Sequence, residues 1–144
     1  MEERTVDILK RKSAGEPFPC KLGMRVTKVE PGYALVEMAF EPDMRNTLGT
    51  MHGGAIFSLI DEAFELSCNS HGTLAVALNM NITYIAPPEA GSHLKAEATE
   101  ISCSGRTGTY QIMVTDDKGR QIAVCQALAY RKKEAVSFFD GTSL

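Results

Sequence analysis

One apolar segment constrains the fold of this chain more than any other feature. Between Ala55 and Cys68 the sequence contains neither proline nor glycine, and its apolar side chains would cover well over half of a helix surface. A helix of this kind must be buried by the rest of the chain. It follows the triplet His-Gly-Gly at 52–54, and we predict that it ends near 71–72, where a glycine can terminate it.

Polar side chains form a narrow stripe along this helix. They are Ser58, Asp61, Glu62, Glu65 and Asn69, which recur at the spacing of one helix face. A row of charges on a helix is usually a solvated face, and we interpret Glu62 and Glu65 mostly in that way. Glu65 lies on the same side of the helix as Asp61, and its like charge could shift the pKa of Asp61.

Asp61 is the strongest candidate for a catalytic carboxylate. Phe57, Ile60 and Phe64 flank it on the helix, and apolar surroundings disfavour the charged form of a carboxyl group. Desolvation would therefore raise its basicity toward that of a useful general base. The alternative is a solvated charge at the edge of the core.

The helix start supplies the other half of a hydrolytic site. Gly53 and Gly54 present backbone N–H groups that have no partner within a helix, and such a start can bind the oxyanion of an acyl transfer. Gly53 and Asp61 are eight residues apart, which is about 12 Å along one helix. A general base must reach its target directly or through one water. Both groups can act on one bond only if the second comes from another subunit, which predicts a homodimer with shared active sites.

The rest of the chain reads as strands. They are predicted at 26–29, 34–40, 74–86, 92–103, 107–116 and 120–131. The short turns between them favour antiparallel neighbours, and a sheet with one apolar face can bury the helix by wrapping around it. We therefore predict an α+β fold with an antiparallel sheet around one long helix. Its exposed edge strands would be covered by pairing with a second copy.

The length of the chain fits one domain with short additions at both ends. We place an N-terminal helix and linker at 1–22, the main domain at 23–131 and a C-terminal tail at 132–144. Within the first part, 2–13 has the pattern of a short amphipathic helix, and 16–19, with two prolines, is predicted to be an extended linker.

Composition excludes several classes of function. The net charge of −3 gives no electrostatic case for nucleic acid. The four cysteines form no CxxC pair, so we expect neither a disulfide framework nor a metal site. We expect no cofactor either. No signal peptide and no apolar run long enough to cross a membrane is visible, which predicts a cytoplasmic protein without a membrane partner.

Two motifs carry a resemblance to a known family. The first consists of Asn46, Gly49, His52, Gly53, Gly54 and Asp61 at their observed spacing, and the second is Leu-Asn-Met-Asn-Ile-Thr-Tyr-Ile-Ala-Pro at 78–87. Together they resemble the hotdog-fold acyl-CoA thioesterases, in particular the phenylacetate-degradation and 4-hydroxybenzoyl-CoA thioesterase group. The resemblance covers about 23–131 and implies the hotdog fold, a homotetramer built as a dimer of dimers, and hydrolysis of an aryl- or fatty-acyl-CoA to free acid and CoA.

The resemblance also implies roles for single residues. Asp61 would activate water or attack the thioester carbonyl itself, and the Gly53 N–H would polarise that carbonyl. His52 and Asn46 would orient the thioester and shape the loop; the alternatives are a capping histidine and a loop-bracing asparagine. Ala77 departs from the family, because many relatives carry a serine or threonine there that helps to hold the attacking water.

A further set of residues is expected to contact the substrate. They are Gly54, Leu48, Met51, Asn79, Gly105, Arg106 and Thr107. Leu48 and Met51 would lie near the acyl group. In the family the loop at 105–107 lies near the nucleotide or pantetheine; the alternative is a plain β-turn with a solvated arginine.

Two other functions compete with hydrolysis. One is a module that binds acyl-CoA without turning it over. The other is a hotdog dehydratase or hydratase, which also needs a histidine and a carboxylate, but the spacing of His52 and Asp61 does not resemble that branch.

Overall fold

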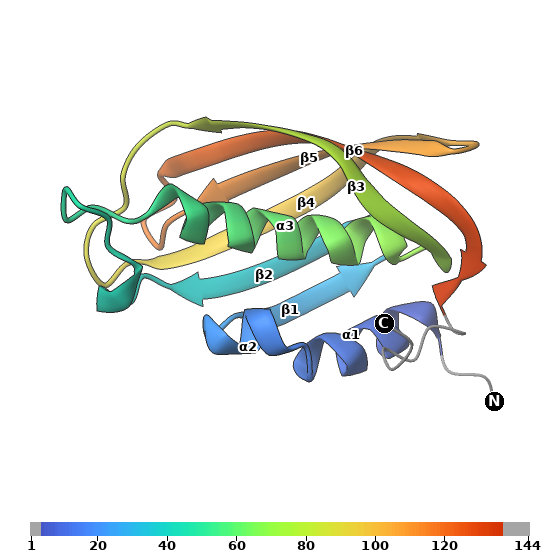
Figure 1. Cartoon of the computed structure of the whole chain (residues 1–144), viewed down its shortest axis with the longest axis horizontal. Coiled ribbons are helices and arrows are strands. Elements are labelled where there is room, and N and C mark those ends of the chain that lie inside the picture. The colour runs from blue at the N-terminus through green and yellow to red at the C-terminus, as the bar shows by residue number, and fades with distance from the viewer. Residues whose placement is uncertain (1–3, 137–144) are drawn as a thin grey trace.

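The computed structural model describes residues 4–136 and places one long helix inside a curved sheet (Figure 1). The helices are α1 (Thr5–Ala14), α2 (Pro17–Lys21) and α3 (Gly53–Asn69), with a short 3-10 helix η1 (Pro42–Met44). The strands are β1 (Arg25–Glu30), β2 (Tyr33–Ala39), β3 (Thr73–Tyr84), β4 (His93–Ser104), β5 (Thr107–Thr115) and β6 (Gln121–Ala135). The described part of the chain contains no helix of the length and apolar character that crossing a membrane requires.

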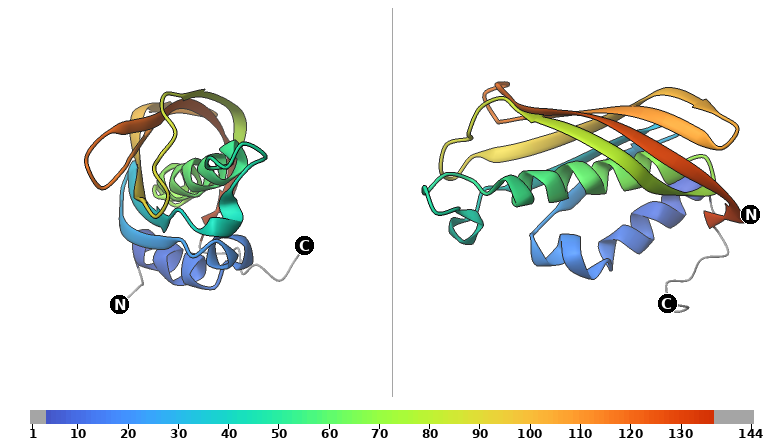
Figure 2. Two further views of the ribbon diagram at one scale, coloured as in Figure 1. Left: turned by 90° about the vertical axis from the view of Figure 1, so that its left-hand side faces the viewer. Right: turned by 45° about the horizontal axis from the view of Figure 1, so that its top comes forward.

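The six strands form one antiparallel sheet in the order β1-β2-β4-β5-β6-β3. The sheet curves around α3, which Figure 2 shows in the view along the helix. This confirms the predicted α+β class and the hotdog arrangement. The two outer strands differ in their surroundings, because α1 packs beside β1, whereas β3 pairs only with β6 among the described strands.

The core lies between α3 and the concave face of the sheet. Leu59, Ile60 and Ala63 are fully buried on the sheet side of the helix. The ring of Phe64 meets the ring of Tyr110 on β5 edge to face, with 5.6 Å between their centroids. This buried stripe fixes the rotation of α3 about its axis, and thereby decides which side chains point away from the sheet.

The predicted N-terminal helix is confirmed as α1, but the prediction of an extended linker at 16–19 is wrong. Residues Pro17–Lys21 form α2, whose first backbone bond runs from Cys20 N to Glu16 O at 3.2 Å. Pro17 and Pro19 lie in the first turn of this helix, where backbone N–H groups need no helical partner, so neither proline removes a bond.

The ends of two elements also differ from expectation. Helix α3 ends at Asn69, earlier than predicted, because the Asn69 side chain bonds both the N–H and the carbonyl of Ala75, at 2.8 and 3.1 Å, and turns the chain into β3. Strand β6 continues past 131, since its register with β3 extends to the pair Thr73 and Ala135. Of the tail predicted at 132–144, residues 137–144 lie outside the described residues.

Candidate active site

The start of α3 leaves one backbone donor without a partner. His52 caps the helix, and its Nδ1 accepts a hydrogen bond of 2.9 Å from Gly54 N. A Cβ on Gly54 would lie 3.0 Å from that Nδ1, so a larger residue there would crowd the capping ring. Among residues 4–136 no group accepts a hydrogen bond from Gly53 N–H. Of the two glycines, Gly53 is therefore the one whose N–H is available to a ligand.

Tyr84, at the end of β3, is a part of this site that sequence reasoning did not assign. Its hydroxyl donates to the carbonyl oxygen of Gly53 at 3.1 Å. A Cβ on Gly53 would meet the Tyr84 ring at 3.3 Å, so the glycine lets the ring lie against the helix start. The tyrosine stands in the second motif, which was the available signal, but only the fold brings it to Gly53.

The loop before α3 is braced by Asn46. Its Oδ1 accepts from the N–H groups of Leu48 and Thr50, at 2.9 and 3.1 Å, and its Nδ2 donates to the Thr50 hydroxyl at 2.9 Å. This is the loop-bracing alternative for Asn46. Leu48 projects from the loop with 86% exposure, whereas Met51 is buried in the core at 4%, so of the two only Leu48 offers an open apolar surface.

Asp61 is exposed on α3. Ile60 and Phe64 point into the core, so the prediction that they surround this carboxylate is wrong, and half-exposed Phe57 is the flanking residue that shares its solvent side. Partial burial nevertheless raises the pKa of Asp61 above its ordinary value, and the charge of Glu16 raises it further. Asp61 is therefore a stronger base than a fully solvated aspartate.

A carboxyl cluster beside Asp61 was not predicted. It joins Glu16, on the turn before α2, to Glu62 and Glu65 of α3, with one oxygen from each within 4.8 Å of the others. Glu62 is only 5% exposed, and its Oε1 has no hydrogen-bond partner within 4–136, so its interpretation as a solvated residue is wrong. Burial raises the pKa of Glu62 and Glu65 above the ordinary value, and the neighbouring Glu16 raises the pKa of both further. Glu16 could not be found from sequence, because its contact depends on the packing of α2 against α3.

Glu62→Gln is expected to stabilise the protein at pH 8 by about 2 kcal/mol, because the folded chain must keep the Glu62 carboxyl protonated at a pH where the unfolded chain releases that proton, whereas the amide has no proton to release. The pKa of Glu62 is higher in the folded chain than in the unfolded chain. Its contribution to the free energy of unfolding is therefore complete below the unfolded-state pKa and is lost as the pH rises toward the folded-state pKa. The gain should therefore be small at pH 5. Urea unfolding at the two pH values measures it, with exposed Glu134→Gln as the control, and an equal gain at both would contradict the expectation.

The remaining predicted contacts are spread along the molecule. On β3 the side chain of Asn81 donates to Asn79 Oδ1, and both residues are exposed beside Ala77. The turn between β4 and β5 contains Gly105, with φ +55°, and Arg106, whose Nη1 donates to the hydroxyl of Tyr130 at 2.9 Å. This turn lies at the end of the molecule where α3 stops, away from Gly53 (Figures 1 and 2).

One chain therefore brings only part of the predicted site together. Asn46, His52, Gly53 and Gly54 form a cluster at the start of α3. Asp61 lies two turns further along the same helix, and the turn at 105–107 lies at the opposite end.

The sequence of this chain is similar to those of known proteins. The thioesterase superfamily matches residues 48–123. The acyl-coenzyme A thioesterase PaaI of Escherichia coli is 34% identical over 110 residues, which cover 76% of this chain and 79% of that protein. Human acyl-coenzyme A thioesterase 13 is 30% identical over 97 residues, which cover 65% of this chain and 69% of that protein.

Solved structures agree with these matches. The E. coli PaaI protein from the phenylacetic acid degradation operon superposes with a TM-score of 0.84 at 30% identity, covering 87% of this chain and 91% of that one. A mutant of the phenylacetic acid degradation protein PaaI from Thermus thermophilus gives a TM-score of 0.78 at 36% identity, with 81% and 100% covered.

Proposed function

The chain belongs to the thioesterase superfamily, and we propose that it is an acyl-CoA thioesterase, which hydrolyses an aryl- or fatty-acyl-CoA to the free acid and CoA. The observation that carries this proposal is the free Gly53 N–H at the start of α3, on the same helix as a carboxylate of raised pKa. The relatives named above as acyl-CoA thioesterases support the same reaction.

The chemistry follows from the two groups. The thioester carbonyl accepts a hydrogen bond from Gly53 N–H, at the positive end of α3, which stabilises the oxyanion that forms on attack. Asp61 of a second copy removes a proton from water as the water oxygen attacks the carbonyl carbon. The tetrahedral intermediate then collapses, the C–S bond breaks, and the thiolate of CoA takes up the proton. Asp61 acting as the nucleophile is the alternative course.

His52 holds this arrangement in place. Because its Nδ1 accepts from Gly54 N, a neutral ring carries its proton on Nε2, and the side chain is exposed at the start of the helix. His52 thus keeps the Gly54 N–H occupied, leaving Gly53 as the oxyanion donor.

A homodimer is needed to complete the site. We infer that two copies pair through β3, since this outer strand exposes apolar side chains, with Val76 at 41% and Leu78 at 59%. Antiparallel pairing of two identical edges relates the copies by a two-fold axis and brings the start of one α3 toward the middle of the other. The homotetramer and the cytoplasmic location remain predictions, and light scattering measures the first.

Replacing both Val76 and Leu78 with lysine is expected to give monomers and to lower hydrolysis at least about 100-fold, because each monomer would keep only half of the site. Size-exclusion chromatography and thioesterase assays measure the two effects. Ile101→Lys is a matched control, since Ile101 is 58% exposed but lies on β4. A monomeric variant with full activity would contradict the shared site.

The exposed side chains near the helix start favour an aryl group. Phe57 and Tyr84 are 39% and 50% exposed, and with Leu48 they offer aromatic and apolar surface to an acyl group. A panel of aryl- and fatty-acyl-CoA substrates with detection of the free thiol tests the proposed function. Hydrolysis of at least one class supports it, whereas tight binding without turnover of any substrate would favour the binding module instead.

A further inference from the structure

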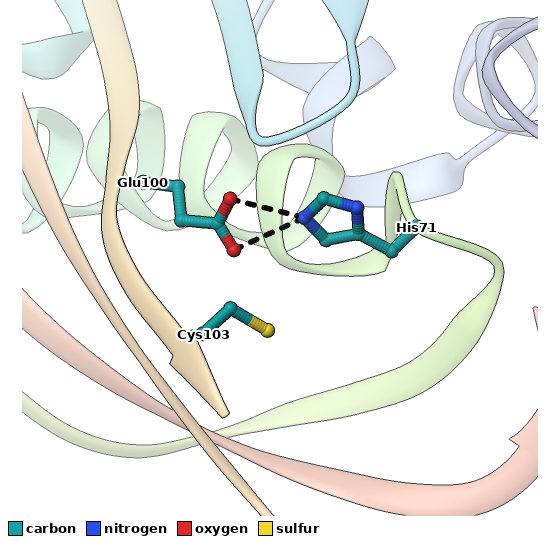
Figure 3. Close-up of side chains that lie close together, drawn as sticks. All are labelled: His71, Glu100 and Cys103. Atoms are coloured by element: carbon teal, nitrogen blue, oxygen red, sulfur yellow. Dashed lines mark hydrogen bonds and ion pairs between the residues drawn. The ribbon is translucent and has the colours of Figure 1, made fainter. Parts of the chain in front are cut away.

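Three side chains of different chemistry meet at the end of α3 that lies away from Gly53. They are His71, Glu100 and Cys103, shown in Figure 3. The Nε2 of His71 lies 3.0 and 3.1 Å from the two carboxylate oxygens of Glu100. One donor atom from each of the three residues lies within 4.8 Å of the others.

A β-bulge in β4 creates this cluster. Residues three apart on a regular strand point to opposite faces, so Glu100 and Cys103 would normally be separated by the sheet. The register with β5 shifts between Glu100 and Ser102, and Ile101 is left without a partner. Glu100 and Cys103 therefore project from the same face.

Several neighbouring groups hold the carboxylate of Glu100 in position. The Tyr110 hydroxyl donates to its Oε1 at 3.3 Å, and its backbone N–H donates to the carbonyl of Gly32 at 2.8 Å. A Cβ on Gly32 would lie 2.7 Å from Glu100 Oε2, so the glycine of the β1–β2 turn leaves the room that the carboxylate occupies. His71 arrives from the turn between α3 and β3, where Gly72 has a φ of +94°.

We propose that His71, Glu100 and Cys103 form a binding site for Zn²⁺. An imidazole nitrogen, a carboxylate oxygen and a thiolate sulfur are the three ligand types that zinc takes in proteins, and their present separation needs only small side-chain rotations to close around an ion. On binding, the Cys103 thiol gives its proton to solvent, and the His71–Glu100 contact is replaced by a bond from each to the metal. The Tyr110 hydroxyl would hold the carboxylate in the outer shell.

The fourth position would be open. The three residues line a shallow, solvent-open depression of about 430 Å³ together with Ile101, Ser102 and Arg131. The guanidinium of Arg131 donates to the Gly105 carbonyl oxygen at 3.2 Å. A zinc ion with three protein ligands keeps a site for water or for an anionic group, and the depression gives that group access. The sequence predicts no metal site because 29 residues separate His71 from Glu100, and only the fold and the bulge bring the ligands together.

The test uses the full chain without a histidine tag, reduced and freed of metal by a chelator. Titration with zinc against a competing indicator should give one ion per chain with micromolar or tighter affinity. Cys103→Ala and His71→Ala should each weaken binding at least about 100-fold, and Tyr110→Phe about 10-fold. Cys20→Ala is the matched control, because Cys20 is exposed elsewhere, and it should bind zinc like the natural chain.

A second measurement distinguishes loss of a metal ligand from failure of a variant to fold. Cobalt added to the natural chain should give thiolate-to-metal charge-transfer absorption, which Cys20→Ala retains and Cys103→Ala loses. Millimolar affinity, or tight binding that survives both the Cys103 and the His71 substitutions, would overturn the proposal. The site contains neither Gly53 nor Asp61, so Asp61→Asn should bind zinc normally.

Discussion

Asp61→Asn is expected to lower kcat for acyl-CoA hydrolysis about 10²- to 10⁴-fold, because an amide cannot take the proton from water or attack the carbonyl. The substitution keeps the shape of an exposed side chain on α3, so binding of acyl-CoA and the melting temperature should change little. Release of free thiol measures the rate. Asp117→Asn, in the exposed turn before β6, is the control that should keep full activity.

The pH dependence gives a second readout of the same residue. Asp61 must be ionised to act, and partial burial together with Glu16 raises its pKa, so activity should fall on the acid side at a higher pH than an ordinary aspartate would give. Glu16→Gln should move this acid limb to lower pH, because it removes the neighbouring charge. If the Asp61→Asn variant hydrolysed acyl-CoA as fast as the natural chain, Asp61 would not be the catalytic carboxylate.

Gly53→Pro should lower kcat about 10²- to 10³-fold, because it deletes the single N–H group that is expected to hold the oxyanion. Gly53 is the first residue of α3, where proline is well tolerated, and His52 already has the extended conformation that precedes a proline. Gly53→Ala is the matched control, since it adds a similar Cβ against Tyr84 but keeps the N–H. Equal losses in both variants would indicate crowding rather than loss of the donor.

Mixing the two inactive variants tests whether the site is shared. A mixed dimer of Gly53→Pro and Asp61→Asn chains has one site with both natural groups and one site with neither. Random exchange in an equal mixture should therefore restore about a quarter of the natural activity. No recovery after subunit exchange would show that each chain carries its own complete site.

The sequence predicted the fold well because its signals are local. The helical pattern of α3, the β-forming runs and the turns with glycine, as at Gly32, each specify an element without knowledge of the others. The helix α2 was missed because Pro17 and Pro19 usually mark extended chain, and only their place in a first turn makes them compatible with a helix.

Features that depend on tertiary contacts could not be predicted in the same way. The pattern could not show that Glu62 is buried against Glu16, since the rotation of α3 is set by the whole core. The contact of Tyr84 with Gly53 joins residues 31 positions apart. Cys103 and Glu100 share a face of the sheet only because of a one-residue bulge. The bulge interrupts the regular alternation of side chains between the two faces of a strand, which is what a sequence pattern can show.

The unequal edges of the sheet limit how far self-association can proceed. Since α1 packs beside β1, the proposed pairing of two copies runs through β3, and it would leave neither β3 edge exposed. Assembly by this route would stop at a closed pair. Removal of α1 would unmask the other edge and is the change that would allow copies to add one after another.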